Sequence, residues 1–191
     1  MKPKLFNILA LFFVLSLLGC AHNVDFRTPD TYQHGTVLPY TAAFHMDQNM
    51  KNKVWSGRAA SSGIIHRWDV PIGKTVGQYA NSYLKTAFKE YNEIETLETK
   101  QAYDILIKVK DINYRMANQA AHCDLTFIVE DSKGKEVFSN KYSEVGPSEF
   151  GRVMGGGVFA QKSAIRQSSD VALAKIFGNF VKDIQTNYKN W

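Results

Sequence analysis

Two long runs of alternating apolar and polar residues, at 103–114 and 121–130, constrain the fold of this chain most strongly. Such alternation is typical of strands that bury one face and expose the other. The turn-forming residues 131–134 separate the second run from another extended segment at 137–142. We therefore predict a hairpin with a glycine-assisted turn, preceded by a long strand that contains a bulge before its last apolar residues.

Amphipathic helices are predicted on either side of these three strands. Residues 75–91 and 158–186 carry apolar side chains at three- and four-residue spacing. Strand character at 40–45 and 63–70 predicts a first strand pair. Because short turns join antiparallel strands, we expect an α+β fold: a two-layer sandwich of a mostly antiparallel sheet with two amphipathic helices on one face. The other sheet face should be partly polar and carry Lys108, Lys110, Asp124, Thr126 and Glu130.

The segment before the first predicted strand is polar, contains Pro29 and Pro39, and lacks an apolar period. We predict that residues 20–39 form a flexible tether with a lipidated amino terminus. Residues 40–191 should form a single globular domain, because about 150 residues are enough to build an adequate core.

The amino-terminal region has the layout of an export signal. Lys2 and Lys4 precede an apolar stretch at residues 5–18, which ends in the run Leu17-Leu18-Gly19-Cys20. This run resembles the lipobox of bacterial lipoproteins, and the resemblance implies a signal peptide at residues 1–19. The apolar stretch is shorter than the ~20 residues that cross a bilayer. A plain signal peptide and an uncleaved anchor are the alternatives.

The likeness to bacterial lipoproteins further implies that Cys20 is the lipidation site. A thioether-linked diacylglycerol would be added to its thiol, the chain cut after Gly19, and the new amino group acylated, for example with palmitate. Two or three acyl chains hold a protein to a membrane for long times. In enteric bacteria an aspartate after the cysteine retains such proteins at the inner membrane, and Ala21 stands there instead. The resemblance therefore implies the cell outer membrane, with the domain facing the periplasm.

Neither nucleic acid nor nucleotide is an expected partner. Removal of residues 1–19 lowers the formal net charge from +5 to +3, because two lysines and no acidic residue leave. So weak a charge, interleaved with acids, is not typical of a nucleic-acid surface. Gly73-Lys74-Thr75 opens a predicted helix, but Trp68 occupies the position where a Walker A loop needs its first glycine.

A metal site and a catalytic nucleophile are not expected either. Cys123 is the only thiol left once Cys20 carries lipid, and its place in the alternating run predicts burial, with a reactive or pairing thiol as the alternative. The neighbouring His122 should point to the opposite sheet face. No recognised ligand spacing or hydrolase motif contains the histidines, which are His22, His34, His45, His66 and His122.

A glycine-rich stretch at 146–157 is predicted to be a mobile loop before the last helix. Phe150, Arg152 and Met154 offer an aromatic, a cationic and an adaptable apolar contact, so they are candidate partner-binding residues. A flexible connector is the alternative.

Acidic residues cluster at the end of the first predicted helix. Carboxylate pairs can perform acid and base chemistry on glycans, although a charge run at an element boundary is usually solvated surface. The cluster consists of Glu90, Glu93, Glu95 and Glu98.

The arrangement of the domain resembles small periplasm-facing lipoproteins of the YajG type and the auxiliary lipoproteins of envelope lipid transporters. The resemblance rests on residues 76–91, 104–109 and 170–176 and covers about residues 40–186. It implies a binding or scaffolding role, accessory to envelope assembly or transport, with the membrane and an envelope protein as partners. We expect no enzyme activity, cofactor or metal. The alternatives are a lipid- or glycan-handling enzyme that uses the acidic cluster, and a structural subunit of an envelope machine.

Overall fold

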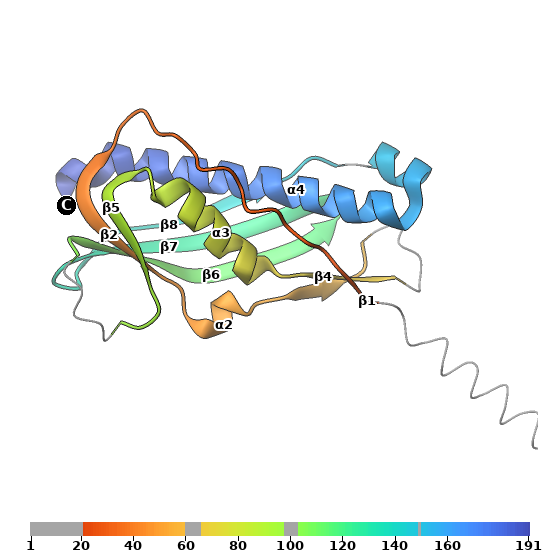
Figure 1. Ribbon diagram of the computed structural model, residues 1–191, viewed down its shortest axis with the longest axis horizontal. Helices are drawn as coiled ribbons and strands as arrows, with labels where there is room; N and C mark the ends of the chain where they lie inside the picture. The colour runs from red at the N-terminus through yellow and green to blue at the C-terminus, as the bar shows by residue number, and fades with distance from the viewer. Residues whose placement is uncertain (1–20, 60–65, 98–102, 149) are drawn as a thin grey trace, which may run out of the picture.

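The computed structural model of the protein describes residues 21–59, 66–97, 103–148 and 150–191 (Figure 1). Within these ranges the chain forms two sheets and several helices. In chain order the elements are β1 (Ala21–Asn23), β2 (Leu38–His45), α2 (Gln48–Lys51), β3 (Trp55–Gly57), β4 (Arg67–Val70), α3 (Ile72–Leu84), β5 (Phe88–Ile94), β6 (Ile105–Ala117), β7 (Ala120–Asp131), β8 (Glu136–Val145), α4 (Phe150–Asn187) and the 3-10 turn η1 (Tyr188–Asn190).

Both sheets are mixed. The larger sheet has the order β5-β2-β6-β7-β8, and β2 runs parallel to both β5 and β6, while β6, β7 and β8 are antiparallel. The smaller sheet has the order β1-β4-β3, with β1 parallel and β3 antiparallel to β4. The expected mostly antiparallel sheet is therefore wrong. Short turns impose antiparallel pairing only among β6, β7 and β8. Long stretches of chain separate β2 from its neighbours β5 and β6, and such connections permit parallel pairing.

The first two predicted strands do not pair with each other. Residues 40–45 lie in β2, and residues 67–70 of the second segment form β4, which belongs to the other sheet. Residues 60–65 lie outside the described ranges. The alternating pattern identified the strands, but it carries no information about which strands become neighbours.

The predicted hairpin and the predicted bulge are confirmed. β7 and β8 pair across a turn in which Gly134 has a φ of 78°, a backbone conformation that glycine adopts without a steric penalty. The Asp131 carboxylate accepts hydrogen bonds from the backbone N–H groups of Lys133 and Lys135, at 2.8 and 2.9 Å. The register of β6 and β7 shifts between Val109 and Asp111. Local turn chemistry therefore fixes the register of this half of the sheet.

Helix α3 ends earlier than predicted. It stops at Leu84, and Phe88–Ile94 forms the edge strand β5 rather than the last turns of a helix. The backbone N–H of Leu38 donates to the Ala87 carbonyl at 2.8 Å, just before Leu38 and Phe88 pair in the sheet. Pairing with β2 thus outweighs a spacing of apolar residues that a helix would also satisfy.

Helix α4 begins earlier than predicted. Phe150–Asn187 is one helix, so the predicted loop at 146–157 is helical from residue 150 onward. Glycine disfavours a helix by about 1 kcal/mol relative to alanine. A helix that is already anchored by packing needs only propagation, however, which costs far less than nucleation. Val153, which is buried, adds an apolar contact in this first part of α4.

The core lies where α3 and α4 contact the larger sheet, and α4 runs along the sheet beside β7 and β8 (Figure 1). Phe127 of β7 stacks on Phe180 of α4 with ring centroids 4.2 Å apart. Tyr79 of α3 stacks on Phe177, and its hydroxyl donates to an Asp170 carboxylate oxygen at 3.1 Å. Aromatic contacts therefore join the two helices and the sheet into one core.

Residues 21–37, which we call the N-terminal strap, pack on the domain instead of forming a free tether. Val24 is 1 % exposed. Asp25 makes an ion pair with Lys162 of α4 at 2.6 Å. The Tyr32 ring stacks on Tyr83 of α3 with centroids 4.7 Å apart. The polar composition of this segment predicted a linker, but the strap crosses both helices (Figure 1) and contacts α3 through Tyr32 and α4 through Asp25.

Candidate functional site

A pocket of about 460 Å³ lies on the polar face of the larger sheet. The register pairs Arg115 with His122 across β6 and β7, and Asp124 with Ser143 across β7 and β8. Tyr114 and Cys123, which alternate with these residues, are buried in the core. The polar side chains therefore point away from the core. We call this cavity the polar-face pocket, and it is lined by Asn113, Tyr114, Arg115, His122, Asp124, Ser143, Glu144 and Val145.

Hydrogen bonds and ion pairs hold the polar side chains of the pocket in place. The Arg115 guanidinium donates to Nδ1 of His122 at 3.1 Å. In that arrangement the other ring nitrogen of His122 carries the hydrogen and can donate to a ligand. Lys141 makes an ion pair with Asp124 at 3.2 Å. The pocket thus presents the guanidinium of Arg115 and the carboxylate of Asp124 on neighbouring strands.

Asp124 remains ionised in this environment. Partial burial acts to raise its pKa, but hydrogen bonds from Ser143 and Lys141, together with the positive charges of Lys141 and Arg115, outweigh burial and hold the pKa below its usual value. A carboxylate with a lowered pKa is a poor proton donor at neutral pH. It is well suited to accept hydrogen bonds from a partner.

The predicted separation of His122 from Cys123 is confirmed. Cys123 is buried, and burial, followed by the negative charge of Asp124, raises the pKa of its thiol to about 12. His122 lies on the opposite face, in the pocket. The thiol is therefore protonated at neutral pH and cannot form a nucleophilic pair with the imidazole.

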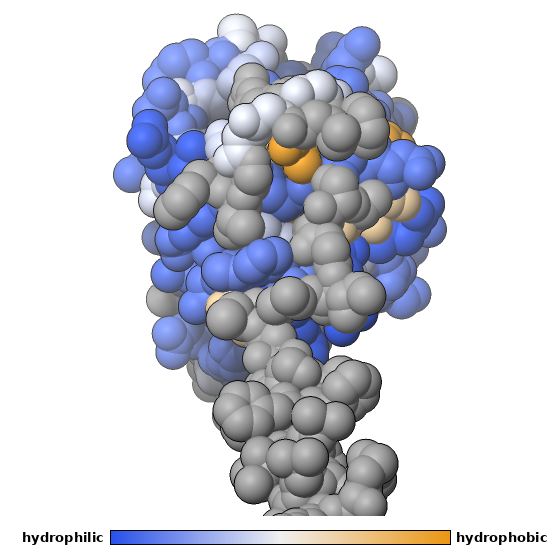
Figure 2. Space-filling view, turned by 90° about the vertical axis from the view of Figure 1, so that its right-hand side faces the viewer, coloured by the Kyte–Doolittle hydropathy of each residue, from blue (hydrophilic) through white to orange (hydrophobic). Residues whose placement is uncertain are grey.

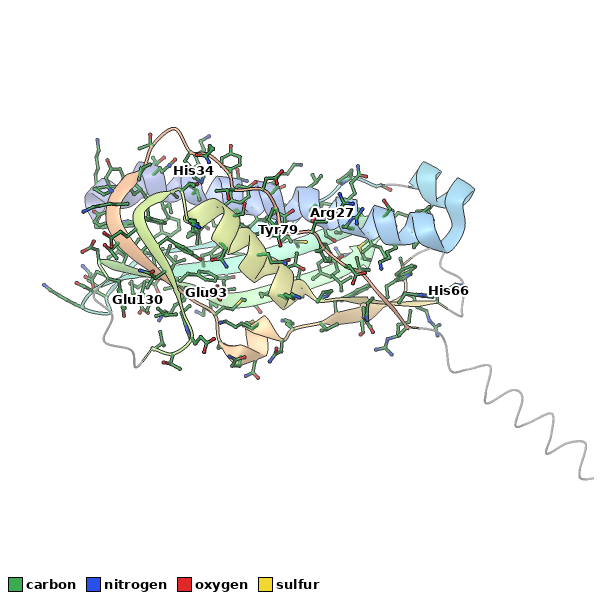
Figure 3. All side chains as sticks on the ribbon, in the orientation of Figure 1. Arg27, His34, His66, Tyr79, Glu93 and Glu130 are labelled. Atoms are coloured by element: carbon green, nitrogen blue, oxygen red, sulfur yellow. The ribbon has the colours of Figure 1, made fainter. Side chains whose placement is uncertain are left out.

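The structure brings His22 and His66 together, which the sequence did not predict. Nε2 of His22 and Nδ1 of His66 are 3.0 Å apart, and the His22 ring packs beside Trp68 with centroids 5.1 Å apart. Figure 3 shows His66 at the end of the domain that carries β1 and β4. In the described ranges, no group of three or more His, Cys, Asp or Glu side chains could hold a metal ion. The pair contributes to the joining of β1 to the domain.

The acidic cluster lies on and beside the edge strand β5, and two of its members, Glu90 and Glu93, are engaged in local contacts. Glu93 makes an ion pair with Lys51 at 3.2 Å and accepts a hydrogen bond from Asn81 at 3.0 Å (Figure 3). Glu90 accepts a hydrogen bond from Thr41. Glu98 lies outside the described ranges. These contacts are typical of a solvated strand edge.

Gly73 has a packing role rather than a phosphate-binding role. A Cβ atom at this position would lie 1.9 Å from the Met50 carbonyl oxygen, at the end of α2. The Gly73 backbone N–H donates to the Lys53 carbonyl at 2.9 Å, so that donor is already used. Lys74 is exposed, as expected. Gly73 is thus the residue that allows α2 and α3 to approach closely.

Two sets of predicted site residues lie beyond what the structure describes. Cys20 precedes the described ranges. The backbones of Phe150, Arg152 and Met154 belong to α4, but their side chains are not described. Within the described ranges, no helix is long and apolar enough to cross a membrane.

Comparisons with known proteins reveal only distant structural likenesses. No family model and no curated protein match the chain. A candidate lipoprotein from Caulobacter crescentus is similar with a TM-score of 0.40 and 14 % identity, over 60 % of this chain and 80 % of that one. A hypothetical protein from Chlamydia trachomatis is similar with a TM-score of 0.43 and 6 % identity, over 77 % of this chain and 96 % of that one. Likenesses this distant assign no function to the chain.

Proposed function

We propose that this protein is a lipoprotein, held in the outer membrane by acyl chains on Cys20, whose periplasm-facing domain binds an envelope protein through the polar-face pocket. The observation that carries the binding role is the pocket itself, on a sheet face that the chain leaves polar. The motivation for the anchor is the basic start, the apolar stretch and the run that ends at Cys20.

The composition of the pocket supports recognition of a protein partner. Its volume falls within the range of roughly 300–1,000 Å³ that is usual for small-molecule pockets, so the case for a protein partner rests on the lining residues. Arg115 supplies a planar donor, a residue type that interfaces favour, and Asp124 supplies an ionised acceptor. Val145, which is 48 % exposed, adds an apolar contact at the β8 edge. A polar segment with charges of both signs would match this surface.

The same side chains favour binding over catalysis. Asp124 is held ionised by Lys141 and Ser143, so it is not poised to exchange a proton near neutral pH. Cys123 is buried on the other face of the sheet. The enzyme alternative would use the acidic cluster, but Glu93 is already occupied by Lys51 and Asn81. We therefore propose a binding or scaffolding role without a cofactor.

Site-specific crosslinking in intact cells tests the proposal. A photo-reactive residue is placed at Ser143, which lines the pocket, or at Ser139, which is exposed on the same strand four residues earlier. Both positions lie on the same face of β8 because side chains alternate along a strand. We expect a crosslinked envelope protein from position 143 and several-fold less from position 139. Equal yields would contradict a role for the pocket.

Charge removal provides a second test of the same surface. Arg115→Ala should lower the yield from position 143 several-fold, because the planar donor of the pocket is lost. Lys110→Ala is the matched control, since Lys110 is an exposed cation on the same strand outside the pocket lining. A crosslinked product that contains a second copy of this chain would instead favour the structural-subunit alternative. It would contradict the proposal that the partner is a different protein.

A further inference from the structure

We infer that the end of the domain formed by the smaller sheet rests on the membrane surface, with Arg58 and Arg67 against the phosphates of lipid headgroups. This inference rests on the proposed lipid anchor at Cys20. It adds an orientation and a second binding surface to the proposed function, because it states which part of the domain faces the membrane.

The first argument is the short reach between the anchor and the sheet. Ala21 follows Cys20 directly, so their Cα atoms lie about 3.8 Å apart. Ala21 pairs with Arg67 in the parallel register of β1 and β4, and neighbouring strands lie about 4.8 Å apart. The backbone of Arg67 is therefore within roughly 10 Å of the acylated residue. The headgroup region of one leaflet is itself about 5–8 Å thick.

The second argument is that the N-terminal strap leaves no slack near the anchor. The Val24 backbone N–H donates to the Asp69 carbonyl at 2.9 Å, and the Val24 side chain is buried. Asp25 is held by Lys162 of α4. His22 contacts His66. A chain joined to the domain from Ala21 onward cannot act as a spacer, so the domain must stay close to the leaflet that holds the lipid.

The third argument is the charge of this end. The Arg67 side chain is 59 % exposed. The antiparallel register of β3 and β4 ends with Gly57 beside Trp68, and the exposed Arg58 follows Gly57 directly in the chain. Arg67 at the start of β4 and Arg58 just beyond β3 thus place two guanidinium groups at this end of the smaller sheet. Cations near an anionic membrane surface are attracted to it, and guanidinium binds phosphate in a bidentate manner.

The surface of this end suits contact with headgroups rather than insertion into hydrocarbon. Figure 2 views the molecule from this side, and the described residues visible there are mostly hydrophilic, with small apolar spots. Asp69, two positions along β4, makes an ion pair with Arg67 at 3.9 Å and accepts a hydrogen bond from Ser56. Asp69 therefore offsets part of the Arg67 charge, and the remaining positive charge of Arg58 and Arg67 is the feature that a phosphate-rich surface would recognise.

Proximity to labelled lipids tests the inference on the full lipidated protein in vesicles of phosphatidylethanolamine and phosphatidylglycerol. A fluorophore is attached at Ser56→Cys on β3, or at Glu136→Cys at the far end of the larger sheet; both positions are exposed. Labelling is specific, because Cys123 is buried and the Cys20 thiol carries lipid. The quencher is a lipid with a nitroxide on its headgroup. We expect several-fold stronger quenching at position 56 than at position 136, and equal quenching would overturn the inference.

Charge reversal of the two arginines tests whether their charges orient the domain on the membrane or whether the strap alone keeps it nearby. Arg58→Glu with Arg67→Glu should reduce quenching at position 56 several-fold, whereas Lys133→Glu with Lys135→Glu should leave it unchanged. The control lysines are exposed and lie in the β7–β8 turn. If the reversed variant fails to fold, Arg58→Gln with Arg67→Gln gives the same readout. Unchanged quenching in the folded arginine variant would contradict the role of the charges.

Fatty-acid labelling of each preparation distinguishes the two possible failures. Protein without a fatty-acid label would refute the anchor at Cys20, and with it the proposed membrane attachment. Labelled protein that shows equal quenching at both positions would refute the seating of the smaller sheet alone.

Discussion

Replacement of Phe180 by alanine should destabilise the domain severely. Phe180 is fully buried in α4 and stacks on Phe127 of β7 with ring centroids 4.2 Å apart. Tyr142 meets it edge-on at 6.0 Å and Phe138 lies 6.2 Å away. This one ring therefore joins α4 to two strands of the larger sheet. Its removal leaves a void that is bounded by rigid strands on one side.

The magnitude follows from two contributions. Burial of a phenylalanine side chain stabilises the folded state by roughly 2–3 kcal/mol. Loss of the ring opens a void of up to about 80 Å³, which costs a further 2 kcal/mol or so at about 24 cal/mol per Å³ when the neighbours do not collapse. We therefore expect Phe180→Ala to lower the free energy of unfolding by about 4 kcal/mol, within the usual ~3–5 kcal/mol for such sites. The melting temperature should fall by roughly 8–16 °C.

Urea denaturation followed by circular dichroism measures the effect, with the slope of the transition as a check on the two-state assumption. Phe180→Leu is the matched control, because it keeps most of the volume and should cost less than about 1.5 kcal/mol. Phe138→Ala, at a half-buried position on the margin of the same cluster, should also cost less. A midpoint for Phe180→Ala equal to that of the parent, with an unchanged slope, would refute the reasoning, since a core ring cannot be removed without loss.

Three further outcomes are expected. Cys20→Ser should abolish incorporation of labelled fatty acid and leave a soluble or uncleaved chain, because serine offers no thiol for the lipid; retained label would contradict the anchor. Replacement of Phe150, Arg152 and Met154 together by alanine tests the start of α4 as a second contact with the partner of the polar-face pocket: it should weaken partner crosslinking in cells at equal abundance, and undiminished capture would leave the pocket as the proposed interface without the start of α4. Asp124→Asn should make the free energy of unfolding depend less on pH in acid. Folding lowers the Asp124 pKa, so the stabilising contribution of the carboxylate is present above about pH 4 and is lost as the pH falls through the folded-state pKa. Urea unfolding at about pH 5 and pH 2.5 checks this, and since the Asp124 side chain is 36 % exposed and therefore screened by solvent, the difference should be a fraction of a kcal/mol.

The parts of the fold that depend on neighbouring residues could be predicted from the sequence. Alternation located β6 and β7, and the turn with Gly134 fixed how β7 meets β8. The bulge near Val109 was visible as a change in the phase of the apolar residues. In each case the two partners are joined by a few residues, so local chemistry determines the pairing.

The parts of the fold that depend on residues distant in the sequence could not be predicted. The end of α3 and the start of β5 are set by pairing of Phe88 with Leu38, fifty residues earlier, and nothing around Phe88 records it. The N-terminal strap looked like a linker because its anchoring side chains, such as Val24 and Tyr32, are few. The partners of these two residues, Asp69 of β4 and Tyr83 of α3, come from elsewhere in the chain.

The pocket could be predicted only in part. The polar positions of the alternating runs indicated a polar sheet face and included Asp124, and His122 was correctly placed on that face. No sequence pattern around Arg115 indicated that this residue lines the pocket. It joins the site because β6 and β7 align it with His122, and that register depends on the bulge and the turn at Asn118.

The central place of β2 has a consequence for how the chain reaches its native state. β2 is an early strand, yet both of its neighbours, β5 and β6, come later in the sequence. Thr36, just before β2, accepts a hydrogen bond from Gln185 near the end of α4. Pairings of such long range form slowly, because the chain entropy of closing large loops must be overcome first. A nascent chain that ends before Ile105 contains only one of the two strands that pair with β2. The larger sheet and the strap that crosses the helices can therefore reach their native arrangement only after nearly the whole polypeptide has been synthesised.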